Sequence, residues 1–191
     1  MRRTLPRVYS LEQMAEMVTL PDLDRPEGLR DRAMIAVLAS TAIRASELCD
    51  LRVADVTERQ LFVRHGKGGS PRYVPMTALA WAAVTDYLVA YPARAGEPLF
   101  RTGPGRGLTR RRLHKAVSAY SRRLHLGQGV HVLRSSAATA WLNSGVNLRH
   151  VQLGLGHAKI ETTAIYLKTA THALIADFRR HFEPMLAQLT E

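Results

Sequence analysis

The sequence predicts a mixed α/β domain that is predominantly α-helical and contains one small antiparallel β-hairpin. Apolar residues recur at helical spacing through most of the chain, several of these segments follow a serine or threonine that can cap a helix, and one pair of short strand-like segments flanks a glycine-rich turn. With 191 residues, 46% of them hydrophobic, the chain can bury a real core. We therefore expect residues 10–191 to form one domain behind a loose basic tail over residues 1–9.

The first part of the chain is predicted to form three helices. Ser10 and Gln13 have the spacing of a capping box, which predicts a short helix that ends at about residue 18. After a loop with two prolines, apolar residues three and four apart predict a helix over about residues 29–42. Arg44 follows directly, and a short helix over residues 46–51 comes next.

Two short strands are predicted over residues 60–64 and 72–75. The turn between them is His65-Gly66-Lys67-Gly68-Gly69-Ser70, whose glycines are typical of a hairpin end. Thr77 is placed to cap a helix that ends near residue 91. Residues 92–108 are rich in proline and glycine and predict a loop with a short extended piece at residues 99–100.

The rest of the chain is predicted to be helical. Thr109 can cap a basic helix that extends to about residue 124, and a second helix is expected over residues 131–143. A third, over residues 148–153, should be broken by Gly154-Leu155-Gly156. A short helix over residues 161–168 and an amphipathic helix from about residue 171 complete the domain.

Composition points to a polyanionic partner. The formal net charge is +11 and the isoelectric point is about 10.6, so nucleic acid is the first candidate and an anionic membrane surface the second. The single cysteine, Cys49, excludes a disulfide framework and suits a reducing cytoplasm. Because the chain has no signal peptide and no apolar run of about 18 residues, we expect a cytoplasmic protein without membrane insertion.

A set of polar residues suggests phosphoryl transfer. Tyr166 is a candidate nucleophile, although a phenol with its usual pKa of about 10 needs a strongly electropositive site. Arg44 and Arg134 can supply that site, because a guanidinium fork matches two phosphate oxygens. His131 and His157 can add hydrogen bonds or move protons. No cluster of acidic residues suggests a metal site, and we expect no cofactor.

Each of these residues also has an ordinary structural explanation. A tyrosine on a helix usually belongs to an amphipathic face, and His131 before a helix can be a capping or buried group. Gly156-His157 can be a helix C-cap, and Arg134 can be a solvated surface residue. Taken singly these explanations are favoured, but their joint occurrence in one ordered set is not.

The ordered set resembles the tyrosine recombinase (phage integrase) family over residues 10–185. It consists of Arg44 within Thr41-Ala42-Ile43-Arg44-Ala45-Ser46-Glu47-Leu48, Lys67 in the glycine-rich turn, His131-x-x-Arg134, Leu155-Gly156-His157 and Thr162-Thr163-x-x-Tyr166. The resemblance implies a recombinase catalytic-domain fold, a 3′-phosphotyrosine formed by Tyr166, and Lys67 as the acid that protonates the departing 5′-oxygen. It also implies that no ATP or metal is used, and that a tetramer assembles on two DNA sites from a free monomer or weak oligomer.

Two groups of basic residues are expected to contact double-stranded DNA. Around the hairpin we expect Arg64, His65 and Arg72 to follow the phosphate backbone. The basic helix after Thr109 is either a solvated face or, as the resemblance implies, a helix in the major groove. Its candidate DNA contacts are Arg110, Arg111, Arg112, Lys115, Arg122 and Arg123.

The chain departs from the family pattern at several points. Ala42 stands where glycine is common, Ser135 where a histidine is common, and Gly154 where a leucine is usual. Most relatives carry a further N-terminal helical domain, so we expect either a complete short recombinase or a catalytic fragment. The alternatives left open are a type IB topoisomerase-like nicking and closing activity and a DNA-binding regulator that does not cut. In a bacterial cell the protein would associate with the nucleoid when bound to DNA.

Overall fold

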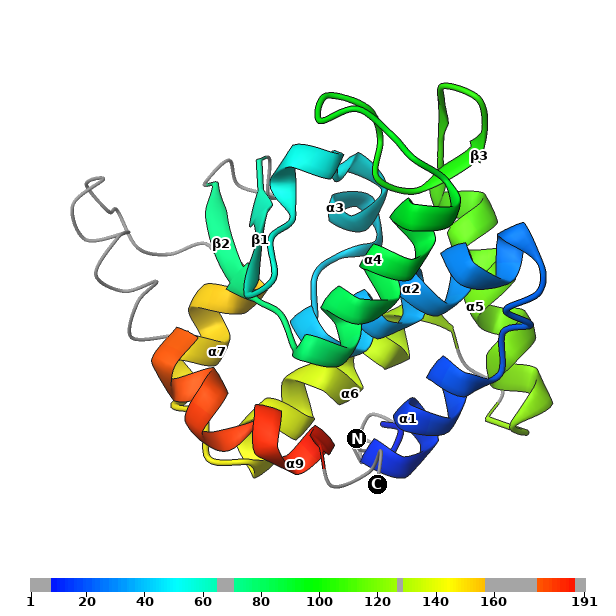
Figure 1. The fold of residues 1–191 in the computed structure, drawn as a ribbon. Coiled ribbons are helices and arrows are strands. Elements are labelled where there is room, and N and C mark those ends of the chain that lie inside the picture. Colours follow the sequence, from blue (N-terminus) through cyan, green and yellow to red (C-terminus); the bar gives the residue numbers. More distant parts are fainter. Residues whose placement is uncertain (1–7, 65–70, 127–128, 157–174, 188–191) are drawn as a thin grey trace.

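The computed structural model describes residues 8–64, 71–126, 129–156 and 175–187 (Figure 1). Within these residues the fold is mostly helical, with two small antiparallel sheets of two strands each, which confirms the predicted fold class. Residues 175–181 also form a helix. The remaining elements are α1 Leu11–Thr19, α2 Pro26–Thr41, α3 Ala45–Asp50, the 3-10 helix Val53–Asp55, β1 Gln60–Val63, β2 Arg72–Pro75, α4 Ala78–Ala90, β3 Arg101–Gly103, β4 Arg106–Gly107, α5 Arg110–Arg123, α6 Val130–Asn143, α7 Leu148–Leu155 and α9 Glu183–Ala187.

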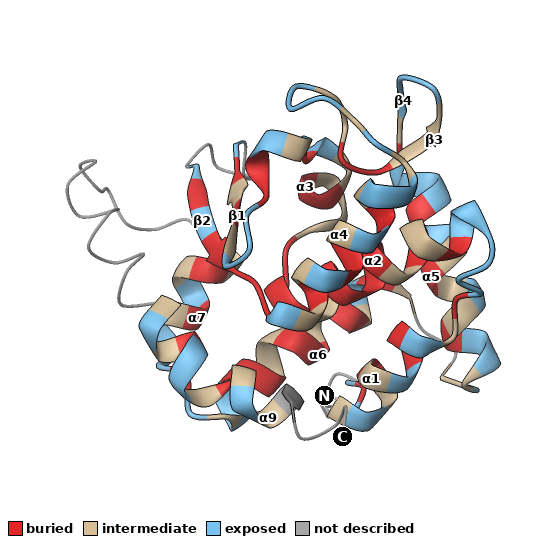
Figure 2. Ribbon diagram, viewed as in Figure 1, coloured by how far each residue is buried: buried red, intermediate tan, exposed pale blue. Residues whose placement is uncertain are grey.

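Helix α2 is the centre of the core. It packs against α1, α4, α5 and α6, and the run from residue 33 to residue 38 is buried on every side (Figure 2). The helix begins three residues earlier than predicted because Pro26, at its first turn, already has the backbone φ of a helix. It ends at Ala42, which takes a left-handed conformation with φ of 50°. That conformation is the physical reason why glycine suits this position.

The capping residues set the helix starts as predicted. The Ser10 hydroxyl accepts a hydrogen bond from the Gln13 backbone N–H at 3.2 Å, and the Gln13 side chain accepts one from Ser10 at 2.9 Å. Thr77 caps α4, and Thr109 caps α5, each through a backbone N–H three residues on. These local signals place the starts of α1, α4 and α5.

The first strand pair also forms as predicted. Strands β1 and β2 are antiparallel, with Gln60 opposite Pro75 and Val63 opposite Arg72. The turn between them, which contains His65 and Lys67, lies outside the described residues. The hairpin stands beside α7, on the left in Figure 1.

The loop predicted over residues 92–108 contains a second hairpin. Strands β3 and β4 pair with a register irregularity between Arg101 and Gly103, and Gly105 takes a positive φ of 63° at the turn. Leu99 donates a backbone hydrogen bond to Leu51 at 2.8 Å, so the extended piece expected there is tied to the end of α3. Such a short pair carries no alternating pattern, which is why the sequence did not reveal it.

The loose tail predicted over residues 1–9 is wrong for Tyr9. This side chain is only 6% exposed, and its backbone N–H donates to the Ser136 hydroxyl on α6 at 2.7 Å. The ring fills the core next to α6, a tertiary contact that a charge pattern cannot predict. Residues 1–7 lie outside the described residues.

The C-terminal part packs on its own domain. Phe178 and Phe182 are fully buried, and their ring centroids lie 5.2 and 6.3 Å from that of Trp141 on α6. Asp177 accepts a hydrogen bond from the Asn147 backbone at 2.7 Å and pairs with His150 at 2.8 Å. The helix predicted over residues 161–168 lies outside the described residues. No helix in the described part of the chain is long and apolar enough to cross a membrane.

Candidate active site

Arg44 lies in the short connection between α2 and α3, as predicted. It is the N-cap of α3, and the Glu47 carboxylate accepts a hydrogen bond from its backbone N–H at 2.8 Å and from Nη1 at 2.8 Å. Nη2 donates to the Gly156 carbonyl at 3.2 Å. The side chain remains 24% exposed, so the guanidinium is held from one side and open on another.

Arg134 reaches the same place from the second turn of α6. Its Nη1 donates to the Ala42 carbonyl, and its Nη2 donates to the Leu155 carbonyl at 3.1 Å. Burial lowers the pKa of Arg134 to about 10, and the neighbouring charges of Arg44 and Arg72 act in the same direction. A guanidinium with that pKa is still protonated at neutral pH. The structure thus brings together the two arginines that the sequence singles out.

Arg72 does not have the surface position that a DNA backbone contact needs. It is 6% exposed; Nη1 and Nη2 bind the two oxygens of Glu47 at 3.1 and 2.9 Å, and Nε donates to the Gly154 carbonyl at 2.8 Å. We correct the expectation for this residue. The strand gave a signal: Arg72 and the buried Val74 are two residues apart and so face the same side of β2, whereas Tyr73 is exposed.

The three arginines cap the C-terminal end of α7. Arg72, Arg134 and Arg44 donate to three successive carbonyls, those of Gly154, Leu155 and Gly156. These carbonyls have no partner within the helix and form the negative end of its dipole, which favours cations. The helix ends within Gly154-Leu155-Gly156 as predicted, but it continues two residues beyond the predicted residue 153, to Leu155, and its C-cap is Gly156.

Gly156 is required at this end for two reasons. Its φ of 62° is left-handed, and a Cβ added there would lie 2.7 Å from Cζ of Arg72. The guanidinium therefore packs directly over the glycine. The residue that follows in sequence, His157, lies outside the described residues, as does Tyr166.

The electrostatic balance of this cluster is positive. Three guanidinium groups face one carboxylate, that of Glu47, which leaves a net charge of +2. Burial alone would raise the pKa of Glu47, but the hydrogen bonds and charge of Arg72, with those of Arg44, hold it below its usual value. Glu47 is therefore a structural carboxylate that pairs with the arginines. Two partly accessible cationic forks with a surplus of charge are suited to bind a phosphate.

His131 is exposed in the first turn of α6, one turn before Arg134. Residues three apart on a helix lie on one face, so His131 borders the arginine cluster. Its carbonyl accepts a hydrogen bond from the Ser135 hydroxyl at 3.1 Å. Ser135, where the family often has histidine, is thus bound within α6.

The sequence matches place the chain in a family. A sequence model described as the phage integrase family matches residues 8–172. The chain belongs to the phage integrase family. It is 37% identical over 179 residues to the tyrosine recombinase XerD of Ralstonia nicotianae, with 89% of this chain and 58% of that protein covered. It is 36% identical over 197 residues to the tyrosine recombinase XerC of Herpetosiphon aurantiacus, with 99% and 64% covered. The chain therefore spans about three fifths of the length of these relatives.

Solved recombinases share the integrase fold found in this chain. The crystal structure of XerA recombinase superposes with a TM-score of 0.69 and 25% identity, covering 94% of this chain and 66% of that one. XerH site-specific recombinase, solved in a pre-cleavage complex with its difH substrate, gives a TM-score of 0.70 and 25% identity, covering 89% and 55%. These likenesses confirm the predicted recombinase catalytic-domain fold.

The other predicted DNA contacts of this integrase-family chain lie at the surface. Arg64 is 43% exposed, and its guanidinium is bound to both oxygens of Asp55 at 2.8 and 3.0 Å. Helix α5 buries Leu113 and Val117 and exposes its cations on the remaining faces. Among the described residues, no carboxylate pairs with these exposed cations of α5, which are Arg110, Arg111, Arg112, Lys115, Arg122 and Arg123. Their charge is therefore available to a polyanion.

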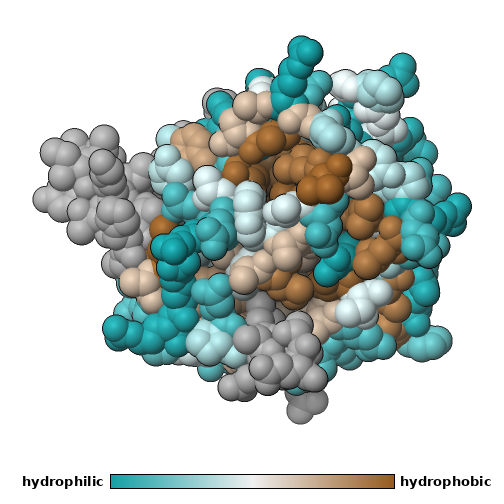
Figure 3. Space-filling model, in the orientation of Figure 1, coloured by the Kyte–Doolittle hydropathy of each residue, from teal (hydrophilic) through white to brown (hydrophobic). Residues whose placement is uncertain are grey.

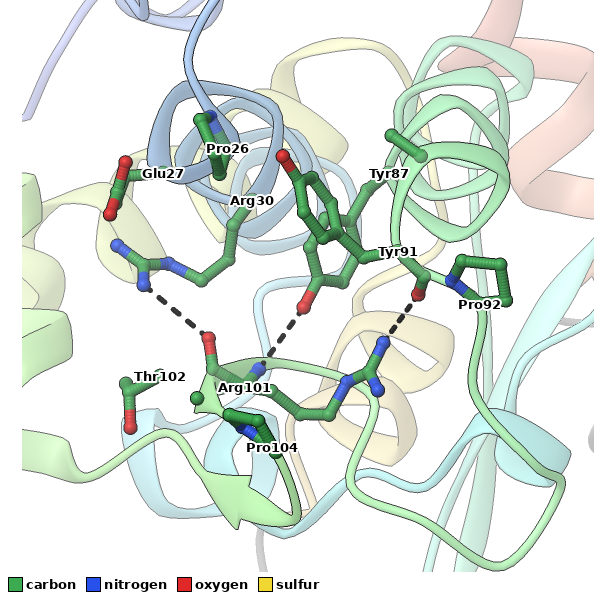
Figure 4. A pocket seen from close by; sticks show the side chains of 11 residues that line it. Pro26, Glu27, Arg30, Tyr87, Tyr91, Pro92, Arg101, Thr102 and Pro104 are labelled. Atoms are coloured by element: carbon green, nitrogen blue, oxygen red, sulfur yellow. Dashed lines mark hydrogen bonds between the residues drawn. The ribbon is translucent and has the colours of Figure 1, made fainter.

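A sizeable cavity in the described part of the chain lies away from the arginine cluster. A space of about 490 Å³ lies between the start of α2, the end of α4 and β3, lined by Arg30, Tyr87, Tyr91 and Arg101 among others (Figure 4). The Tyr87 hydroxyl accepts a hydrogen bond from the Arg101 backbone at 3.2 Å. This cavity is at the opposite end of α2 from Arg44. We place the candidate site at the arginine cluster instead, because Arg44 and Arg134 converge there with a surplus of positive charge that suits a phosphate.

The face of the molecule seen in Figure 1 is not uniformly basic. Figure 3 shows hydrophobic surface gathered over the middle of this face and hydrophilic surface around its margins. Large exposed hydrophobic residues in the described part, such as Val89 at 76% exposure, are few and come from different elements.

Proposed function

We propose that this chain is the catalytic domain of a site-specific DNA recombinase that cuts and rejoins DNA through a covalent phosphotyrosine. The observation that carries the proposal is the convergence of Arg44 and Arg134 at the end of α7, in a chain that also contains Lys67, His131, His157 and Tyr166 in the family's order. The similarity to XerC and XerD over nearly the whole chain supports it.

In the proposed reaction the Tyr166 hydroxyl oxygen attacks the scissile phosphorus, while its proton passes to one of the two histidines, His131 or His157. A bond forms between this oxygen and phosphorus, the bond from phosphorus to the 5′-oxygen breaks, and Lys67 donates a proton to the departing oxygen. Arg44 and Arg134 stabilise the extra negative charge of the five-coordinate phosphorus, with help from His131 and His157. Rejoining reverses these steps with a 5′-hydroxyl from another strand. The phosphotyrosine conserves the energy of the broken bond, so no ATP enters the reaction.

The proposed partner is double-stranded DNA, in the bacterial cytoplasm. XerH was solved on its DNA substrate, and the basic α5 of this chain carries exposed cations that can follow phosphates or enter the major groove. Recombination joins two sites, so we propose a tetramer on two DNA sites, formed from protein that is monomeric or weakly associated when free.

We expect Arg111→Gln and Lys115→Gln on α5 to weaken DNA binding and to reduce its salt dependence. Each phosphate contact that is lost should lower the slope of log K against log salt by about 1. Fluorescence anisotropy at several salt concentrations measures this slope. Arg94→Gln, an exposed arginine outside α5, is the matched control and should leave it unchanged. If all three variants kept the wild-type slope, α5 would not belong to the proposed DNA interface.

A trapping assay tests the proposed chemistry. The protein is incubated with nicked duplexes selected from the DNA that flanks its own gene, then denatured, and a covalent adduct is mapped by mass spectrometry. We expect an adduct at Tyr166 that Tyr166→Phe abolishes. Relaxation of supercoiled DNA without a defined pair of sites would favour a topoisomerase-like activity. Specific binding without any adduct would favour a regulator, and an adduct on another residue would refute the proposed nucleophile.

A further inference from the structure

We propose that Arg72 is a positioning residue for the phosphate site: by binding the Glu47 carboxylate and the end of α7, it leaves the positive charge of Arg44 available to a phosphate. The inference rests on the proposed function, because it assumes that Arg44 and Arg134 bind the scissile phosphate. It assigns to Arg72 a role other than DNA contact.

The geometry separates Arg72 from the other two arginines. All three guanidinium nitrogens of Arg72 donate within the protein, two of them to Glu47 and one to the Gly154 carbonyl, and the side chain is 6% exposed. Arg44 uses Nη1 and Nη2 within the protein, and 24% of its side chain remains exposed. A phosphate can therefore reach Arg44 but not Arg72.

Glu47 is the group that Arg72 controls. Its carboxylate is buried and shared: Oε1 accepts from Arg44 at 2.8 Å and from Arg72 at 3.1 Å, while Oε2 accepts from the Arg44 backbone and from Arg72 Nη2. Without Arg72, Arg44 would be the only cation in the described part of the chain that is bonded to this carboxylate. The two would form a neutral pair, and the net charge of the cluster would fall from +2 to +1.

Arg72 also fixes the end of α7. Its guanidinium holds the Gly154 carbonyl and lies over Gly156, whose carbonyl in turn binds Arg44. The carbonyl between them binds Arg134. One buried side chain thus sets the carboxylate and the helix end that orient both proposed phosphate ligands.

Titration of the whole chain with inorganic phosphate, at low ionic strength, tests this inference without DNA. The arginine side-chain N–H signals of Arg44 and Arg134 are followed by NMR, after assignment with Arg44→Lys. The variants are Arg72→Met, Glu47→Gln, the double variant Arg72→Met/Glu47→Gln, and Arg30→Met. Arg30→Met is the matched control, because it also removes a largely buried arginine that donates two hydrogen bonds to a carboxylate, that of Asp31, but near the start of α2 and away from the cluster.

We expect Arg72→Met to bind phosphate about tenfold more weakly, which corresponds to about 1.4 kcal/mol. The double variant restores the net charge of +2 and should return to within about threefold of the wild-type affinity, whereas a merely structural role would make it as weak as the single variant. Arg30→Met should bind as the wild type does. A thermal melt of each variant shows whether it is folded.

If Arg72→Met does not fold, Arg72→Lys replaces it, because lysine keeps the charge and should lose only about threefold in affinity. The inference is overturned if Arg72→Met binds phosphate as tightly as the wild type, or if the double variant binds it as weakly as Arg72→Met does. It is also overturned if phosphate does not shift the Arg44 and Arg134 signals of the wild-type protein. The phosphate titration contains no DNA and is therefore independent of the trapping assay. If the trapping assay gave no adduct at Tyr166, the proposed function would fail, but the phosphate affinities would still test the role of Arg72.

Discussion

Arg134→Ala should reduce the rate of covalent adduct formation by at least about 100-fold, because removal of one preorganised donor to developing negative charge typically costs about 100- to 1000-fold. In the proposed function Arg134 is one of only two guanidinium groups on the scissile phosphate. Its pKa of about 10 keeps it protonated at neutral pH, so the charge that is lost is a full one.

The same substitution should also destabilise the fold. Arg134 donates to the carbonyls of Ala42 and Leu155, which join the end of α2 to the end of α7. Leaving these part-buried acceptors without a partner costs about 1–3 kcal/mol. Arg134→Lys separates the two effects, because lysine retains the charge but not the planar fork, and we expect a loss of adduct rate with a smaller loss of stability.

Single-turnover kinetics on a trapping duplex, together with urea unfolding, measures both quantities. Arg149→Ala is the control: this arginine is exposed in the first turn of α7, at the opposite end from Gly156, and forms no side-chain ion pair among the described residues. Its adduct rate should stay within about twofold of the wild-type rate. An Arg134→Ala rate within tenfold of wild type would show that Arg134 does not bind the reacting phosphate.

The fold was predictable where local chemistry decides it. Ser10, Thr77 and Thr109 place the starts of three helices, because a side-chain oxygen next to free backbone N–H groups acts within one turn. The hairpin of β3 and β4 was missed because such short strands carry no alternating pattern. The burial of Tyr9 was missed because it depends on a contact with Ser136, which is distant in sequence.

The site was predictable only in part, because motif spacing identifies residues but does not show which groups their side chains contact. The sequence identifies Arg44 and Arg134 through motif spacing, and the structure brings them to one helix end. It does not distinguish an arginine that faces DNA from one that faces a buried carboxylate, as Arg72 does. A charge count treats the two alike, whereas the alternation of β2 around Val74 distinguishes them.

We expect Trp141→Ala to lower the free energy of unfolding by about 3–5 kcal/mol, the usual cost of removing a buried tryptophan. Trp141 is fully buried on α6, and its indole Nε1–H donates to the Ser40 carbonyl on α2 at 3.0 Å. Its ring also contacts Phe178 and Phe182 edge-on, so the cavity would open between the core and the C-terminal helix.

Urea unfolding, followed by circular dichroism, measures this loss. Trp81→Ala on α4 is the matched control, because Trp81 is only partly buried and should cost clearly less than Trp141→Ala. Trp141→Phe keeps the aromatic contacts and removes the indole N–H, so its cost should be about 1–2 kcal/mol. A loss below about 1 kcal/mol for Trp141→Ala would mean that the aromatic cluster does not anchor the C-terminal helix.

The Trp141 variants also test whether the C-terminal helix helps to position Tyr166 for the proposed reaction. The sequence between Gly156 and Ile175 contains Tyr166; Gly156 is held by Arg44, and the helix that begins at residue 175 is held by the aromatic cluster. Trp141→Ala removes this anchor and should lower the rate of adduct formation, whereas Trp141→Phe keeps the aromatic contacts and should lower it less. Both rates are measured at a temperature where both variants are fully folded. Equal rates would show that Tyr166 is positioned without the C-terminal anchor, and that the arginine-capped end of α7 is sufficient.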